Sequence, residues 1–78
     1  AAGYELYLKP ASQCVTVAET TFGTISEAAL RRNEVAIGYR LAKFAKDPDH
    51  GFGVVVNPAK RAKVPCGVGD KIIVLAED

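Results

Sequence analysis

Residues 69–76, which read Gly-Asp-Lys-Ile-Ile-Val-Leu-Ala, decide the fold of this chain. Gly69 can adopt a positive φ without a Cβ clash, and Asp70 can bond to the backbone two residues on, so the pair predicts a turn. A run of branched apolar residues follows, whereas a half-exposed strand would alternate with polar residues. Residues 72–75 are therefore predicted to form a strand with both faces buried. We expect it to be the central strand of a sheet.

The length and composition indicate one small globular domain. The chain has 78 residues, of which 49% are hydrophobic and 24% are charged, and these values argue against disorder. A net charge of +1 gives no electrostatic reason to expect nucleic acid as a partner. No apolar run approaches the roughly 20 residues that span a bilayer, and residues 1–5 do not resemble a signal peptide. We expect a soluble segment of a longer protein.

Four further strands are predicted, at residues 4–8, 14–17, 34–40 and 52–56. In the first, Tyr4, Leu6 and Leu8 share one face, as in a half-buried strand. In residues 34–40, strict alternation places Val35, Ile37 and Tyr39 on one side and Ala36, Gly38 and Arg40 on the other. Residues 41–51 and 59–63 are predicted to be polar connections.

One helix is predicted, over residues 20–33. Thr24 and Glu27 have the spacing of a capping box, and Thr21 is an alternative N-cap one turn earlier. An apolar stripe follows at helical spacing, formed by Phe22, Ile25, Ala28 and Ala29. Arg31 and Arg32 are expected in the last turn, where positive charge suits the helix dipole, and Asn33 is expected to end the helix in a left-handed conformation.

These elements do not suffice to cover the sheet. Residues 54–56 and 72–75 need cover on both faces, but a single helix covers only one. Soluble monomers rarely expose a large apolar patch, so the other face should be buried by a second copy or a neighbouring lobe. A symmetric dimer is the commoner solution. The predicted fold class is α+β, with a small, mainly antiparallel sheet of four to five strands and one main helix on one face.

The sequence contains no arrangement typical of an enzyme. The only histidine, His50, lies in a predicted loop with Asp47 and Asp49, and this trio is interpreted as a solvated loop rather than a metal site. No nucleophile elbow, phosphate loop or dinucleotide fingerprint is present. We expect no catalysis, cofactor or metal. Cys14 and Cys66 are interpreted as small buried hydrophobes, and a disulfide between them is an open alternative.

Four stretches together resemble a known family. They are residues 5–10, 36–40, 53–58 and 69–77, which read ELYLKP, AIGYR, GVVVNP and GDKIIVLAE. The chain is similar over nearly its whole length, residues 1–78, to the C-terminal lobe of regulator-of-potassium-conductance (RCK) domains, also called the TrkA C-terminal domain. The similarity is closest to the Castor/Pollux-type ion channel branch.

The resemblance implies a cytoplasmic regulatory and assembly domain of a cation channel or transporter of the potassium type. It implies a homodimer, with a Rossmann-like lobe and a membrane pore as further partners in the parent protein. It also implies a small anionic ligand, such as a cyclic dinucleotide, between paired lobes. The alternative is a purely structural dimerisation lobe that binds no small molecule.

The candidate ligand-binding residues are Arg40, at the end of its strand, with its neighbour Tyr39, and Asn57 with Pro58, at the end of the next strand. The resemblance matches Arg40 to a ligand-contacting arginine, and a guanidinium can bind an anion with two donors. The alternative for Arg40 is an ion pair with Asp or Glu at a surface or interface. The basic stretch at residues 60–63 is too short and lacks the aromatic residues of a nucleic-acid site.

Overall fold

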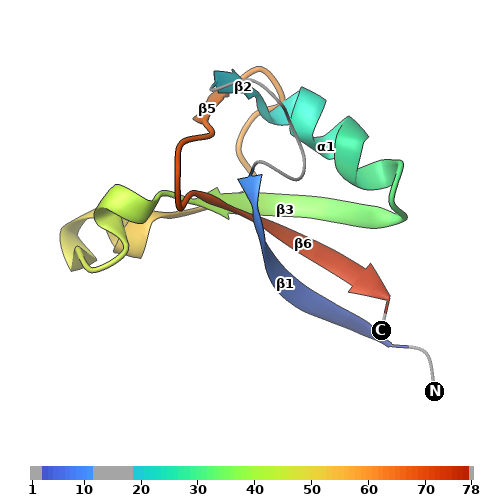
Figure 1. Cartoon of the computed structure of the whole chain (residues 1–78), viewed down its shortest axis with the longest axis horizontal. Helices are drawn as coiled ribbons and strands as arrows, with labels where there is room; N and C mark the ends of the chain where they lie inside the picture. Colours follow the sequence, from blue (N-terminus) through green and yellow to red (C-terminus); the bar gives the residue numbers. More distant parts are fainter. Residues whose placement is uncertain (1–2, 12–18, 78) are drawn as a thin grey trace.

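Strand β6 (Lys71–Glu77) lies at the centre of the main sheet, as the sequence predicts. The computed structural model describes residues 3–11 and 19–77. Its main sheet is antiparallel, with the order β1 (Tyr4–Pro10), β6, β3 (Glu34–Arg40) and β4 (Val54–Val56). The one α-helix in the described part of the chain, α1 (Phe22–Leu30), lies on one face of this sheet (Figure 1). The predicted α+β class, with one main helix, is confirmed.

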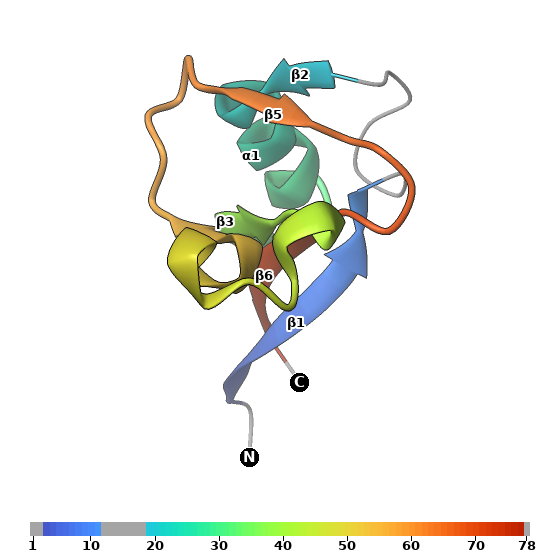
Figure 2. The same ribbon diagram turned by 90° about the vertical axis from the view of Figure 1, so that its left-hand side faces the viewer.

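A second sheet of two strands lies on the same side as α1. Strands β2 (Glu19–Thr21) and β5 (Lys63–Pro65) form an antiparallel ribbon beside the helix (Figure 2). This ribbon buries Val64 almost completely. The sequence did not predict it, because three residues are too few to show a periodic pattern. Two 3-10 helices, η2 (Ala42–Phe44) and η3 (Pro48–Gly53), occupy the predicted connection after β3.

The core lies between α1 and the near face of the sheet. Phe22, Ile25 and Ala29 of the predicted helical stripe are buried there against Ile72 and Val74 of β6. Ala11 and Val64 complete the buried cluster, and Tyr7 packs against it from β1. The helix therefore covers the face of β6 that carries the even-numbered side chains.

The helix begins earlier than the capping box predicted. Thr21 is the N-cap, and its hydroxyl accepts a hydrogen bond of 3.3 Å from the amide of Thr24. The first two helical amides donate to carbonyls far along the chain: Phe22 to Ala62 at 2.9 Å and Gly23 to Lys60 at 2.7 Å. These bonds satisfy donors that a helix start otherwise leaves unpaired. The Thr24 capping box is wrong, and the Thr21 alternative is right.

The helix also ends before the two arginines. Leu30 is its last residue, Arg31 is the C-cap, and Arg32 lies beyond it, so neither arginine is in the last turn. The amides of Arg32 and Asn33 bond to carbonyls three residues back, which tightens the chain and ends the helix. Asn33 has φ 60°, as predicted. Within the described residues, no helix is long and apolar enough to cross a membrane.

A β-bulge in β3 changes which side chains share a face. Ala36 pairs with Val74 and Gly38 pairs with the next residue, Ile73, so Ile37 is an extra residue in the ladder. The predicted alternation of 34–40 is therefore wrong. Val35, Gly38 and Arg40 share one face, while Ala36 and Tyr39 share the face that packs on the core. A period of two cannot reveal an inserted residue.

Strand β4 is shorter than the predicted strand at 52–56. Phe52 and Gly53 have φ values of 57° and 79°, which belong to the left-handed region and not to a strand. A Cβ on Gly53 would lie 2.4 Å from the carbonyl oxygen of Leu41, so the chain approaches itself closely there. The strand begins only at Val54, after this turn.

The turn before β6 is hydrogen-bonded to η2 and to the end of β1. Gly69 has φ 85°, as expected for this turn. The carboxylate of Asp70 accepts hydrogen bonds from the amides of Gly67 at 2.9 Å and Ala42 at 2.8 Å, rather than from a residue two positions on. Its carbonyl accepts from Ala11 at 3.0 Å. Asp70 thus fixes the start of β6 against η2 and the end of β1.

Two expectations fall outside the described residues. The strand predicted at 14–17 lies in the segment 12–18, and so does Cys14 with its alternative disulfide to Cys66. Cys66 is half-buried, and its thiol donates to the carbonyl of Val64 at 3.6 Å.

The close packing at the bulge predicts that substitution of Gly38 lowers stability. A Cβ at Gly38 would lie 2.0 Å from the carbonyl oxygen of Val55, a backbone atom that cannot move without disturbing β4. Gly38→Ala should lower the free energy of unfolding by about 1–3 kcal/mol or more. The measurement is urea unfolding followed by circular dichroism at one protein concentration.

Gly3→Ala is the matched control, because a Cβ there meets nothing within 4 Å and the residue has no positive φ. Its effect should stay within about 0.5 kcal/mol. Equal stability of the two variants would contradict the close approach at the bulge.

Candidate functional site

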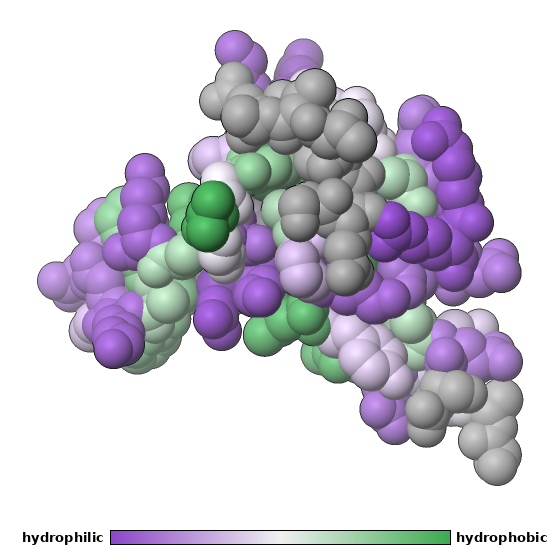
Figure 3. All heavy atoms as spheres, in the orientation of Figure 1, coloured by the Kyte–Doolittle hydropathy of each residue, from purple (hydrophilic) through white to green (hydrophobic). Residues whose placement is uncertain are grey.

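The face of the main sheet opposite α1 is apolar and exposed. The register places the odd-numbered residues of β6 on this face, next to the even-numbered residues of β1. Its apolar members, which we call the open face, are Tyr4, Leu6, Leu8, Val35, Val54, Val56, Ile73 and Leu75. Hydrophobic atoms appear along the lower margin of the molecule in Figure 3, away from the helix.

The two faces of the sheet differ in how much of their apolar side chains is exposed. On the helix side, Ile72 and Val74 are 0% exposed. On the open face, the exposed fractions are 66% for Tyr4, 64% for Leu6, 49% for Leu8, 51% for Val35, 41% for Val54 and 58% for Val56. Ile73 and Leu75 are half-buried between them. The alternation predicted for residues 4–8 is correct, but its apolar side is the side that residues 3–11 and 19–77 leave uncovered.

Charged residues lie at the two ends of the open face. Lys71 begins the β6 row Lys71, Ile73, Leu75, Glu77, and Glu77 ends it. Arg40 pairs with Lys71 across the sheet, so both cations lie at the same end. Tyr4 pairs with Glu77 at the other end. The sequence already indicates that Lys71, Ile73, Leu75 and Glu77 share a face, since alternate residues of a strand point to the same side. Only the register shows that this is the side of the sheet opposite α1.

The four candidate ligand residues occupy different places. Arg40 and Val54 are paired on the open face, whereas Tyr39 faces the core. Asn57 has φ 52° and donates its amide to Ile37 at 2.7 Å, and Pro58 follows it. The structure therefore brings Asn57 and Pro58 to the bulge, while Arg40 lies two positions beyond Gly38 along β3.

Arg40 has an incompletely bonded side chain. The residue is half-buried, and its Nε atom is buried without a hydrogen-bond partner in the described part of the chain. A buried donor without a partner costs free energy, so a group that accepts from it would stabilise the site. The neighbouring Lys71 adds a second positive charge.

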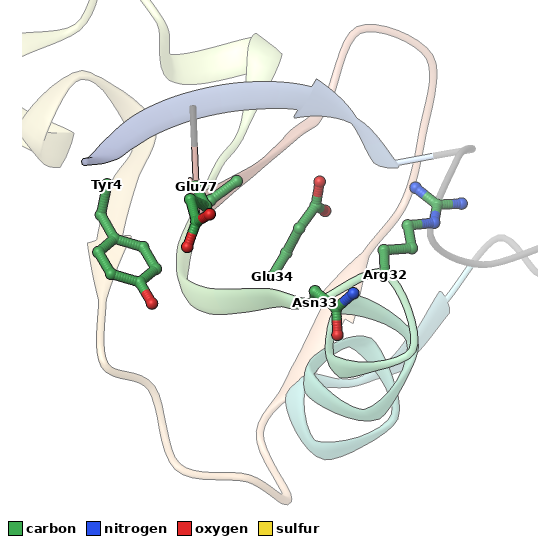
Figure 4. Close-up of a pocket in the computed structure, with 6 residues that line it drawn as sticks. Tyr4, Arg32, Asn33, Glu34 and Glu77 are labelled. Atoms are coloured by element: carbon green, nitrogen blue, oxygen red, sulfur yellow. The ribbon is translucent and has the colours of Figure 1, made fainter. Parts of the chain in front are cut away.

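Two pockets lie elsewhere, and none of the candidate ligand residues lines either of them. The larger, of about 420 Å³, is lined by Tyr4, Arg32, Asn33, Glu34, Ala76 and Glu77. In Figure 4, Tyr4 and Glu77 lie on one side of it, Arg32 on the other, and Glu34 between them. The other, of about 240 Å³, lies at the Gly69–Asp70 turn, next to Pro10 and Cys66.

Glu34 is a buried charge that the sequence did not single out. It is 6% exposed, and one carboxylate oxygen pairs with the ammonium group of Lys9. The other oxygen, Oε1, is buried without a hydrogen-bond partner among residues 3–11 and 19–77. The pair joins β1 to β3 across β6, on the helix side of the sheet.

The predicted polar loop forms a local structure around His50. The ring of His50 stacks on Phe44, with 4.0 Å between centroids, and its Nδ1 lies 2.7 Å from a carboxylate oxygen of Asp47. The other oxygen of Asp47 accepts from the amide of Asp49 at 2.9 Å. In the described ranges, no three His, Cys, Asp or Glu side chains gather as potential metal ligands.

The buried ion pair leads to a stability prediction. Lys9→Met leaves the Glu34 carboxylate buried without its partner and should lower the free energy of unfolding by about 3 kcal/mol. The double variant Lys9→Met with Glu34→Met removes both charges and should be closer in stability to the wild type. Urea unfolding of all three proteins makes the comparison. A Lys9→Met variant as stable as the wild type would show that the pair contributes nothing.

Comparison with known protein families and with curated proteins finds no match to this chain.

Proposed function

We propose that the chain is a regulatory and assembly domain that dimerises through its open face. The observation that carries this proposal is the exposure of six large apolar side chains on one side of the main sheet. Exposing them to water is unfavourable, and a patch of this kind marks an interaction surface in soluble proteins. A second copy of the chain presents the same apolar surface, so each copy buries the patch of the other.

The size of the molecule is compatible with such an interface. A standard interface buries roughly 800 Å² on each partner. This is about one sixth of the 5106 Å² that the chain exposes. The open face extends over all four strands of the main sheet, and a face of that extent can supply the area.

The resemblance to RCK C-terminal lobes supports an assembly role in a cation channel or transporter. In that setting the domain lies on the cytoplasmic side of the membrane, and its partners are a Rossmann-like lobe and a membrane pore. The α+β fold with a central C-terminal strand is compatible with this assignment. The assignment itself remains a proposal based on the motifs in the sequence.

A small anionic ligand at Arg40 is the regulatory part of the proposal. Two features support it. The buried Nε of Arg40 has no hydrogen-bond partner among the described residues, and Lys71 is adjacent at the same end of the open face. The second candidate function is a purely structural dimerisation lobe. It is favoured by the position of Arg40, Tyr39, Asn57 and Pro58 outside both pockets described above.

Self-association is tested by sedimentation equilibrium over a range of concentrations. The wild-type chain should sediment with the mass of two copies. Leu6→Glu should raise the dimer Kd at least about tenfold, because it introduces a charge into an apolar interface. Leu30→Glu is the matched control: Leu30 has nearly the same exposure, 60%, but lies at the end of α1 on the opposite side of the sheet.

A wild-type chain that stays monomeric at high concentration would contradict dimerisation. The same conclusion would follow if the Leu6 and Leu30 variants weakened association equally.

The ligand is tested by thermal unfolding with inorganic phosphate, a nucleoside triphosphate and a cyclic dinucleotide as probes. A probe that binds only the folded protein at 100 times its Kd stabilises it by about 2.7 kcal/mol. Arg40→Ala should abolish this rise in Tm while the unliganded protein stays folded. If no probe raises the Tm of the wild type, or the variant responds equally, the purely structural function is favoured.

A further inference from the structure

The charges at the ends of the open face indicate how two copies are oriented. Lys71 and Glu77 lie on the same face of β6, with Ile73 and Leu75 between them. At roughly 3.3 Å per residue, the two charged positions are about 20 Å apart. The row is therefore positive at its start, apolar in the middle and negative at its end.

Two sheets that pack face to face in a symmetric dimer have two simple orientations. Their two-fold axis lies in the plane between the sheets, either along β6 or at right angles to it. With the axis along β6, the two β6 strands run parallel, and each charged residue faces the same residue of the second copy. With the axis at right angles, the strands run antiparallel, and the start of each β6 faces the end of the other.

Charge distinguishes the two orientations. The parallel one brings Lys71 and Arg40 against the same cations of the second copy, and it brings the two Glu77 carboxylates together. Like charges in contact disfavour an interface strongly. The antiparallel orientation places Lys71 opposite Glu77 at both ends, while Ile73 packs over Leu75 in the middle.

We propose that two copies pack open face to open face with antiparallel β6 strands, so that Lys71 of each copy pairs with the partner's Glu77. Packed sheets lie roughly 10 Å apart, and an extended lysine together with a glutamate can span that gap. The two pairs lie at the rim of the interface, where they set orientation more than affinity. This inference rests on the proposed dimer and adds its orientation.

Charge reversal tests the orientation. Lys71→Glu places a glutamate opposite the partner's Glu77 twice in each dimer, and Glu77→Lys places two lysines opposite the partner's Lys71. Each variant alone should raise the dimer Kd at least about tenfold in low salt. The double variant Lys71→Glu with Glu77→Lys restores opposite charges at both ends and should dimerise like the wild type.

Mixing the two single variants tests whether residues 71 and 77 face the partner copy at all, because their heterodimer pairs opposite charges in either orientation. A heterodimer of Lys71→Glu with Glu77→Lys has opposite charges at both ends, so an equimolar mixture should contain mostly heterodimers. Sedimentation equilibrium measures the affinities, and native mass spectrometry separates the heterodimer from the two homodimers. High salt should reduce the differences in Kd between the variants, since these charges lie at the rim of the interface.

Lys60→Glu and Glu27→Lys are the matched controls, because both residues are exposed and lie outside the open face. They make the same charge changes and should leave the dimer Kd unchanged. Circular dichroism checks that every variant is folded.

The possible outcomes separate this inference from the proposed function. If the wild type dimerises and Leu6→Glu weakens the dimer, but the charge variants have no effect, then the orientation is wrong and the dimerisation stands. The orientation is also wrong if both single variants weaken the dimer and the double variant does not recover it. A monomeric wild type would overturn both.

Discussion

Strand β6 carries apolar side chains on both of its faces, whereas the one helix in the described part of the chain covers only one of them. Helix α1 lies on the even-numbered side of β6, where Ile72 and Val74 are fully buried. The odd-numbered side carries Ile73 and Leu75, and the strands beside it add exposed leucine, valine and tyrosine. The apolar character of β6 thus makes it the centre of the sheet and leaves one face of the sheet available to a partner.

Hydrogen bonds between distant segments fix the position of α1 and of the start of β6. The first amides of α1 donate to carbonyls of Lys60 and Ala62, and the Asp70 carboxylate joins the start of β6 to η2.

The bulge at Ile37 affects both faces of the sheet. It turns Tyr39 toward the core, places Arg40 on the open face, and brings the backbone of β4 against Gly38. One extra residue in a strand therefore decides which face carries the candidate ligand residue.

Assembly and ligand binding belong to the same surface in this proposal. The apolar centre of the open face supplies the area that a dimer buries, and the charged ends supply its orientation. Arg40 lies next to Lys71 at the positive end, so an anion bound there would touch the rim of the interface. A ligand in that position would act on the dimer directly, because it would change the charge that faces the partner copy.

Local sequence patterns are enough to predict the α+β class, the central position of the last strand and the lack of cover for one face of the sheet. Each of these follows from local patterns: a turn at Gly69, an unbroken apolar run in β6, and only one helical stripe. Only the folded chain reveals the bulge, the β2–β5 ribbon, the choice of Thr21 rather than Thr24 as the N-cap of α1, and the ion pair of Glu34 with Lys9. All four depend on contacts between residues far apart in the chain, and neither periodicity nor residue preference records which distant groups will meet.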